Sequence, residues 1–185
     1  MKPIAFLNRI NRIIVSKSNS ERRIKYLRKQ GVKIGKRCLV DTLDFSTEPY
    51  LVELGDYVRV ARGTFFLTHD AGVRCFLEEF PEDDIFGQIK IGNNVFIGGN
   101  STILPNTVIG DNSIVGAGSV VRGEFPENSV IVGNPAKVIM PMKILKSLYK
   151  QNPGRMSTSK MTNEEKKPHI LKHFNLMEEN ENELS

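Results

Sequence analysis

Residues 91–121 read IGNNVF IGGNST ILPNTV IGDNSI VGAGSV V, which is five six-residue blocks and the first residue of a sixth. Two positions of the block repeat along the whole stretch. The first is always Ile or Val, and it is occupied by Ile91, Ile97, Ile103, Ile109, Val115 and Val121. The fourth is always Asn or Gly, and it is occupied by Asn94, Asn100, Asn106, Asn112 and Gly118.

A period of six indicates a coil of short strands joined by corners, because it fits neither an α-helix nor a plain strand. Asn and Gly tolerate left-handed backbone geometry, so their column predicts a corner in every block. The aliphatic column is then expected to point inward. Small or β-branched residues at the fifth position are expected to share that interior: Val95, Ser101, Thr107, Ser113 and Ser119. The alternative is a run of ordinary hairpin strands, which the unbroken register disfavours.

The repeats, with GAGSVV at 116–121 and VIVGNPAKVI at 130–139, resemble the hexapeptide-repeat acyltransferases. Within that family they are most similar to the maltose, galactoside and capsular-sugar O-acetyltransferase branch. The resemblance covers residues 31–139 and implies an all-β solenoid, a left-handed parallel β-helix with three blocks per turn. The handedness follows from the resemblance alone, because parallel crossovers are usually right-handed.

Short helices are predicted on both sides of the solenoid. We expect an N-terminal helical cap over residues 1–30, with a first amphipathic helix in 3–17 and a second that begins after Asn19 or Ser20 and ends at Gly31. The β-helix occupies residues 31–139 and is interrupted by a loop insertion at 72–88.

A C-terminal helical extension and acidic tail are predicted over residues 140–185. Pro135 and Pro141 are expected to end the strand pattern. A helix over 143–150, a linker and a capped helix from Thr162 follow, and the acidic end from Glu178 is expected to lack fixed structure.

Charge is distributed unevenly although the net charge is only +5. Residues 1–37 contain twelve Lys and Arg but one Glu, whereas residues 38–142 contain six basic and fourteen acidic side chains. The basic N-terminus fits a cap and also a peripheral membrane association. We expect no nucleic acid as partner, because no nucleic-acid motif accompanies the charge. A spanning segment needs roughly 18 apolar residues, and this sequence has no such run, so we expect a cytoplasmic protein with Cys38 and Cys75 as free thiols.

His69 is the candidate catalytic residue. The register places it in the fourth, corner position, where a side chain projects outward, and the resemblance assigns it the role of general base. Its orienting partner is left open: Asp70 is adjacent, but neighbouring residues of a strand point to opposite faces, so Glu48, Glu53 and a backbone carbonyl are equal candidates. The long insertion carries aromatic residues, and the resemblance implies that it leans over a neighbouring subunit of a homotrimer.

The co-substrate implied by the resemblance is acetyl-CoA. Backbone N–H groups at Gly99 and Ala117 are expected to contact the thioester and oxyanion. Lys137 stands where a basic residue near the nucleotide is usual. Arg122 replaces a family Thr-Lys pair and is a weaker candidate for a phosphate contact.

We expect an acetyl-CoA-dependent O-acetyltransferase that acts on a sugar or glycan hydroxyl, for example in capsule or exopolysaccharide synthesis. The alternatives are a xenobiotic acetyltransferase of the same fold, acting for example on an antibiotic, and an inert β-helix scaffold. No metal is expected: His169 and His173 share a helix face without further ligands, and the carbonic anhydrases of this fold need three histidines.

Overall fold

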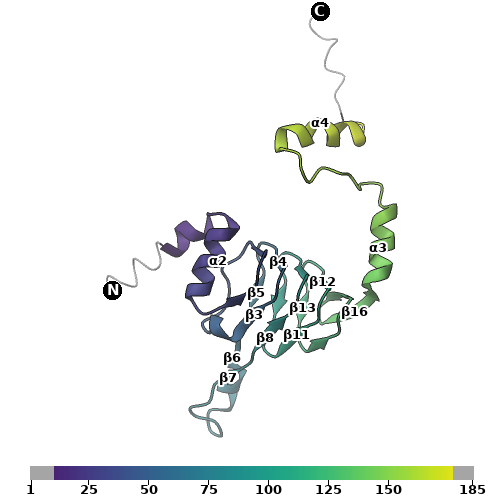
Figure 1. Ribbon diagram of the computed structural model, residues 1–185. Coiled ribbons are helices and arrows are strands. Elements are labelled where there is room, and N and C mark those ends of the chain that lie inside the picture. Colours follow the sequence, from purple (N-terminus) through teal and green to yellow (C-terminus); the bar gives the residue numbers. More distant parts are fainter. Residues whose placement is uncertain (1–10, 177–185) are drawn as a thin grey trace, which may run out of the picture. The chain divides into compact units, whose positions relative to one another are not determined.

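The computed structural model describes residues 11–176, and the chain divides into two compact units, Met1–Lys146 and Ser147–Ser185. The first unit is a coil whose short parallel strands stack into three sheets (Figure 1). The first sheet contains, in spatial order, β1 Lys33–Ile34, β3 Val52–Leu54, β8 Ile89–Ile91, β11 Thr107–Ile109 and β14 Glu124–Phe125. The second contains β16 Ala136–Pro141, β15 Ser129–Gly133, β12 Ile114–Val115, β9 Phe96–Ile97, β4 Arg59–Val60 and β2 Leu39–Val40. The third contains β13 Val120–Val121, β10 Thr102–Ile103 and β5 Phe65–Phe66.

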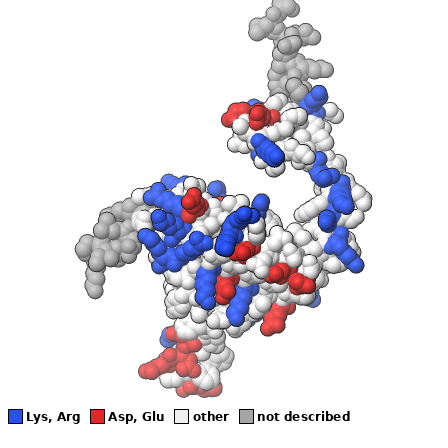
Figure 2. All heavy atoms as spheres, in the orientation of Figure 1, with Lys and Arg blue, Asp and Glu red and all other residues white. Residues whose placement is uncertain are grey.

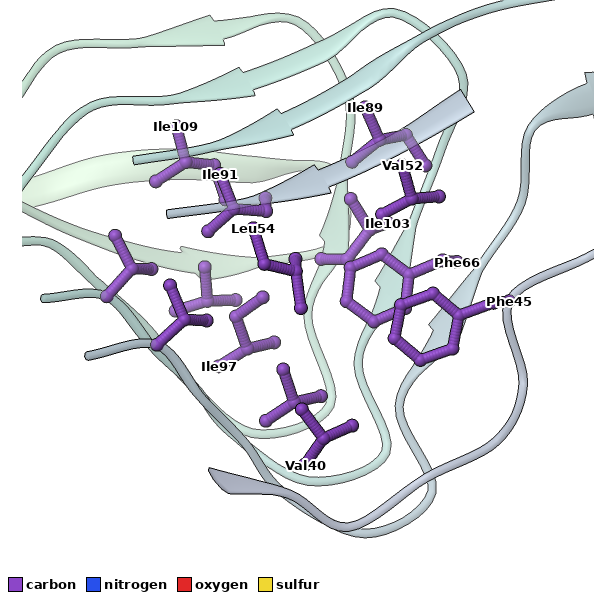
Figure 3. Packing of buried hydrophobic residues seen from close by; sticks show 14 of the residues in the cluster. Val40, Phe45, Val52, Leu54, Phe66, Ile89, Ile91, Ile97, Ile103 and Ile109 are labelled. Atoms are coloured by element: carbon purple, nitrogen blue, oxygen red, sulfur yellow. The ribbon is translucent and has the colours of Figure 1, made fainter. Parts of the chain in front are cut away.

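The strand register confirms three blocks per turn. Ile91 of β8 pairs with Ile109 of β11, which is eighteen residues later, and Ile97 pairs with Val115. Each block therefore contributes a strand to one sheet, and the third block after it returns to the same sheet. The first-position side chains stack inside the coil, where Ile97 and Ile103 are fully buried (Figure 3).

The fourth and fifth positions of the block also behave as predicted. The fourth-position residues all have positive φ, from 53° at Asn94 to 71° at Gly118, so every predicted corner is confirmed. The fifth-position residues are buried, and the hydroxyls of the four Ser and Thr among them donate to backbone carbonyls: Ser101 Oγ, for example, donates to the Gly98 carbonyl at 2.7 Å. Small polar side chains therefore fill the narrow corners without leaving an unpaired group.

Helices precede and follow the coil in the chain. Residues 11–16 are helical, and the rest of the predicted 3–17 helix lies largely outside the described residues. The second helix is confirmed: α2 Ser20–Lys29 begins after Asn19, whose side chain accepts from the Arg22 N–H, and Gly31 follows with φ +98°. In α2, Leu27 is buried against the first turn of the coil and closes its core.

The C-terminal part departs from prediction at Pro135. The strand pattern does not end there, because β15 and β16 form an antiparallel hairpin in which Gly133 is paired with Ala136. The pattern ends at Pro141, and α3 Met142–Gln151 follows as expected. In the second unit, α4 Asn163–His173 begins with the predicted capping box of Thr162 and Glu165. The acidic end from Glu178 lies outside the described residues. Within residues 11–176, no helix combines the length and apolar character needed to cross a bilayer.

Candidate active site

His69 lies where the chain turns from the third sheet to the first. β5 of the third sheet ends at Phe66 and β8 of the first begins at Ile89, and His69 is the third residue after β5. The preceding turn of the coil contributes its own corner here, with Ser46 at φ +55° just before the short 3-10 helix η1 Pro49–Leu51. This irregular corner brings a cluster of polar side chains against the imidazole.

Glu48 is the orienting partner of His69. Its Oε2 lies 2.9 Å from Nδ1 of the imidazole, while the hydroxyls of Ser46 and Thr47 lie at 3.3 and 3.4 Å. Of the alternatives left open by the sequence, Glu53 faces Lys33 on the first sheet instead. The Glu48 side chain is only 15% exposed and that of His69 is 39% exposed. The imidazole is therefore bound by Glu48 on its buried side and is accessible to solvent on the other.

Glu48 is held as a carboxylate by its neighbours. Thr47 Oγ1 donates to Oε1 at 2.6 Å, and Thr68 Oγ1 donates to Oε2 at 2.8 Å. Hydrogen bonds from Thr47, His69 and Thr68 lower the pKa of Glu48 to about 2. Because an ionised carboxylate only accepts, Nδ1 must donate its proton to Glu48, which leaves the Nε2 lone pair to accept one. Nε2 has no hydrogen-bond partner in the part of the chain that the structure describes.

His69 is not the positive-φ residue of a corner, so the predicted fourth-position assignment was wrong. It begins the extended strand β6 His69–Asp70, which pairs antiparallel with β7 Ile85–Phe86, because the chain leaves the coil here instead of turning. The insertion, residues 71–88, follows β6 and includes the 3-10 helix η2 Ala71–Phe76 and β7, and we call it the arm. The arm extends away from the coil (Figure 1).

The arm begins and ends at the same corner. The Gly87 N–H donates to the Thr68 carbonyl at 2.8 Å, and the Phe86 ring stands edge-on to His69 at 6.4 Å between centroids. The large apolar side chains of the arm are exposed in the single chain: Phe76, Leu77, Phe80, Ile85 and Phe86.

Arg122 lies at the same corner as His69, two turns further along the coil. Its guanidinium is 3.6 Å from Asp70, whose other carboxylate oxygen accepts from the Gly72 N–H at 2.8 Å. Arg122 and Asp70 therefore connect the base of the arm to the coil. The predicted contact of Arg122 with a phosphate stays a prediction.

Gly99 and Ala117 stack at a different corner, between the second and third sheets. The Gly118 N–H donates to the Gly99 carbonyl at 2.9 Å, while the N–H groups of Gly99 and Ala117 donate to no group within residues 11–176. Gly98 permits this close stacking, because a Cβ there would lie 2.5 Å from the Ala117 nitrogen. Two unpaired N–H groups on an exposed corner are suited to bind a carbonyl or oxyanion.

One chain does not bring this corner to His69. The two corners bound opposite edges of the third sheet, because the chain passes from the Gly99 corner through β10 before it reaches the edge at which His69 lies. Lys137 is exposed on β16 opposite Val132, which lies against Gly116 beside the Ala117 corner. The predicted residues thus form two half-sites on each chain.

Sequence reasoning named Glu48 only as one of several partners and missed Ser46, Thr47 and Thr68. All but Thr68 lie in the irregular first turn, where no column repeats.

No group of three or more potential metal ligands occurs in residues 11–176. His173 Nε2 instead lies 2.7 Å from the Pro153 carbonyl within the second unit.

Comparison with known proteins gives consistent results. The family model "bacterial transferase hexapeptide (six repeats)" matches residues 88–123. Protein CapG of Staphylococcus aureus is 43% identical over 151 residues, which are 80% of this chain and 87% of CapG.

Similar solved structures include two acetyltransferases. A maltose O-acetyltransferase from Clostridium difficile has a TM-score of 0.55 and 26% identity over 74% of this chain and 84% of its own. A hexapeptide-repeat acetyltransferase from Vibrio cholerae in complex with acetyl coenzyme A has a TM-score of 0.52 and 26% identity over 60% of each chain. The predicted fold, a left-handed parallel β-helix flanked in sequence by short helices, is confirmed.

Proposed function

This chain belongs to the hexapeptide-repeat acyltransferase family, and on that premise we propose that it transfers the acetyl group of acetyl-CoA to a hydroxyl of a sugar or glycan. One observation carries the proposal. The Glu48 carboxylate holds Nδ1 of His69 and leaves Nε2 without a protein partner on an open corner, which is the arrangement a general base requires.

In the proposed reaction, Nε2 of His69 takes the proton of the acceptor hydroxyl as its oxygen attacks the thioester carbonyl carbon. The carbonyl electrons move to oxygen, and the N–H groups at Gly99 and Ala117 stabilise the oxyanion. The C–S bond then breaks as the carbonyl re-forms. The imidazolium returns its proton to the CoA sulfur, and an acetyl ester and free CoA result. Glu48 stabilises the imidazolium and acts through His69 as a positioning residue.

The two half-sites support a site that is shared between subunits. A second copy must supply the Gly99 and Ala117 corner to the His69 of the first, and the exposed apolar side chains of the arm supply a surface for that copy. We propose a homotrimer, because closed cyclic assembly pairs the two different half-sites without leaving one unmatched. Lys137 and Arg122 are proposed to contact the phosphates of CoA.

A sugar acceptor is supported by similarity to a maltose O-acetyltransferase. A role in capsule or exopolysaccharide assembly is proposed from the resemblance of the repeats to the capsular-sugar branch of the family. The test is to incubate the purified protein with radiolabelled acetyl-CoA and a panel of sugars, nucleotide sugars, glycans and chloramphenicol. We expect alkali-labile label on a carbohydrate. Label on chloramphenicol alone would establish the xenobiotic alternative, and no transfer to any acceptor, with no acetyl-CoA binding by calorimetry, would establish the scaffold.

A further inference from the structure

The surface around α2 carries a concentration of positive charge that acetyl transfer does not use. Residues 11–37 contain ten Lys and Arg and one Glu. Figure 2 shows these side chains gathered over α2, whereas acidic side chains gather on the arm. Three of the cations are paired with carboxylates of the coil: Arg12 with Asp44, Arg23 with Asp41 and Lys33 with Glu53.

The other seven cations form no ion pair with any carboxylate in residues 11–176, and all are exposed. They are Lys17, Arg22, Lys25, Arg28, Lys29, Lys36 and Arg37. On α2, Lys25 and Lys29 are one turn apart and face outward, opposite Arg23 and Leu27, which are buried against the coil. The outward stripe of α2 is therefore cationic.

Two of these cations are fixed in position. The Arg28 guanidinium donates to the carbonyls of Ile34 and Gly35, each at 2.8 Å. Arg37 donates to the Tyr57 hydroxyl at 2.6 Å and lies 5.4 Å from the centre of that ring. Binding an anion here would sacrifice little side-chain entropy, because these groups are already ordered.

Apolar side chains accompany the cations. A hollow of about 630 Å³ between α2 and the first turn of the coil is lined by Lys25, Arg28 and Arg37, with Ile24 and the 47% exposed Leu39 among its apolar members. A second hollow, of about 490 Å³, shares Lys25 and Lys29 with it. In the preceding helical segment, Ile13 and Ile14 are 52% and 49% exposed.

From this arrangement we propose that the α2 surface docks on a membrane that contains anionic phospholipids. The cations contact headgroup phosphates, and Ile13, Ile14 and Leu39 enter the apolar boundary beneath them. A soluble polyanion would use the cations but gain nothing from the aliphatic side chains, which is why the lipid surface is favoured. The proposal is independent of the acetyl transfer proposed above.

The experiment is flotation of the full-length protein with phosphatidylcholine vesicles, with and without phosphatidylglycerol, at physiological salt. The charge variant is Lys25→Gln, Arg28→Gln, Lys29→Gln, and its matched control is Lys150→Gln, Lys167→Gln, Lys172→Gln, which removes equal charge from exposed sites in α3 and α4. We expect binding only to the anionic vesicles. Because each surface cation strengthens such binding about fivefold, the charge variant should bind at least about tenfold more weakly, and the control should bind as the wild type does.

A second comparison separates the sources of phosphate. Ile13→Ser with Ile14→Ser should weaken binding to anionic vesicles and leave binding to soluble polyphosphate unchanged. Absence of vesicle binding by the wild type, equal loss in the control variant, or polyphosphate binding without vesicle binding would each overturn the proposal. Dissociation of the charge variant into monomers, measured by light scattering, would also overturn the proposal. The cations would then serve contacts between copies of the chain, for example with the acidic arm.

Discussion

The imidazole of His69 presents two chemically different nitrogens. Nδ1 faces the Glu48 carboxylate at 2.9 Å, whereas Nε2 faces outward without a partner among residues 11–176. Fixing the tautomer in this way leaves one basic position, so the proposed chemistry depends on a single nitrogen.

Replacement of His69 by Ala tests this residue directly. Loss of a positioned general base lowers rates by roughly 10²–10⁴, so kcat should fall by that factor while acetyl-CoA binding, measured by calorimetry, persists. His169→Ala and His173→Ala, in the other compact unit, serve as controls and should leave the rate unchanged. A His69→Ala enzyme with near-normal kcat against a confirmed acceptor would place the base elsewhere.

Glu48→Gln keeps the shape of the partner and removes its charge. We expect kcat to fall by roughly tenfold to 10⁴-fold with KM for acetyl-CoA nearly constant, because Gln can support the wrong tautomer and does not stabilise the imidazolium. Glu48→Asp should recover part of the rate. A rate loss that appears entirely in KM would show that Glu48 contributes to binding instead.

The lowered pKa of Glu48 also predicts a pH dependence of stability. Its pKa falls from 4.5 to about 2 on folding, so its stabilising contribution is fully present above pH 4.5 and is lost as the pH falls towards 2. Wild type should therefore be more stable than Glu48→Gln at neutral pH, and the difference should shrink below pH 4.5. Urea unfolding at a series of pH values measures it; a constant difference down to pH 2 would contradict the assigned contacts.

At the scale of the element, the corner is the unit that builds the coil. In residues 91–121, each corner takes one residue at positive φ and places a small or β-branched side chain directly after it in the interior. Asn106 has φ +63° and an exposed side chain that forms no hydrogen bond with residues 11–176. Its contribution therefore comes from its backbone conformation.

Two substitutions at Asn106 separate backbone from side chain. Asn106→Ala should lower the free energy of unfolding by about 1 kcal/mol, because Ala resists left-handed geometry, and Asn106→Gly should leave it nearly unchanged. Chemical denaturation of both variants provides the measurement. An equal loss of unfolding free energy in the two variants would show that the Asn106 side chain, and not its backbone conformation, stabilises the corner.

The corners could be predicted from sequence because their cause is local and repeats every six residues. Phe45 and Phe66, which stack at 4.4 Å in the core, could not be paired in advance, since the first turn of the coil has no regular register. For the same reason Glu48 remained one candidate of several. The displacement of His69 from a corner into β6 depends on Phe86, seventeen residues away, and no local pattern carries that information.

At the scale of the whole molecule, the half-sites predict complementation between copies. Bulky Phe at the exposed position 117 should block the thioester corner of its own chain and spare His69. Ala117→Phe and His69→Ala homo-oligomers should each be inactive, yet co-refolding them in equal amounts should restore about one quarter of wild-type activity, because that share of sites combines two intact halves.

Light scattering of the wild type accompanies this experiment. We expect the mass of a trimer at micromolar concentration. A monomer, or mixed oligomers that remain inactive, would contradict a site shared between subunits.

The way the arm joins the coil also bears on how such enzymes diversify. The arm follows β6 and returns to the coil at Gly87, whose N–H donates to the Thr68 carbonyl at 2.8 Å, so the coil is closed beneath it. The insertion can therefore change in length and composition without shifting the register of any later strand, and lengthening a surface loop adds little free energy. Under the proposed function, exchange of this one segment can change the surroundings of His69, while His69 and the Gly99 and Ala117 corner are retained.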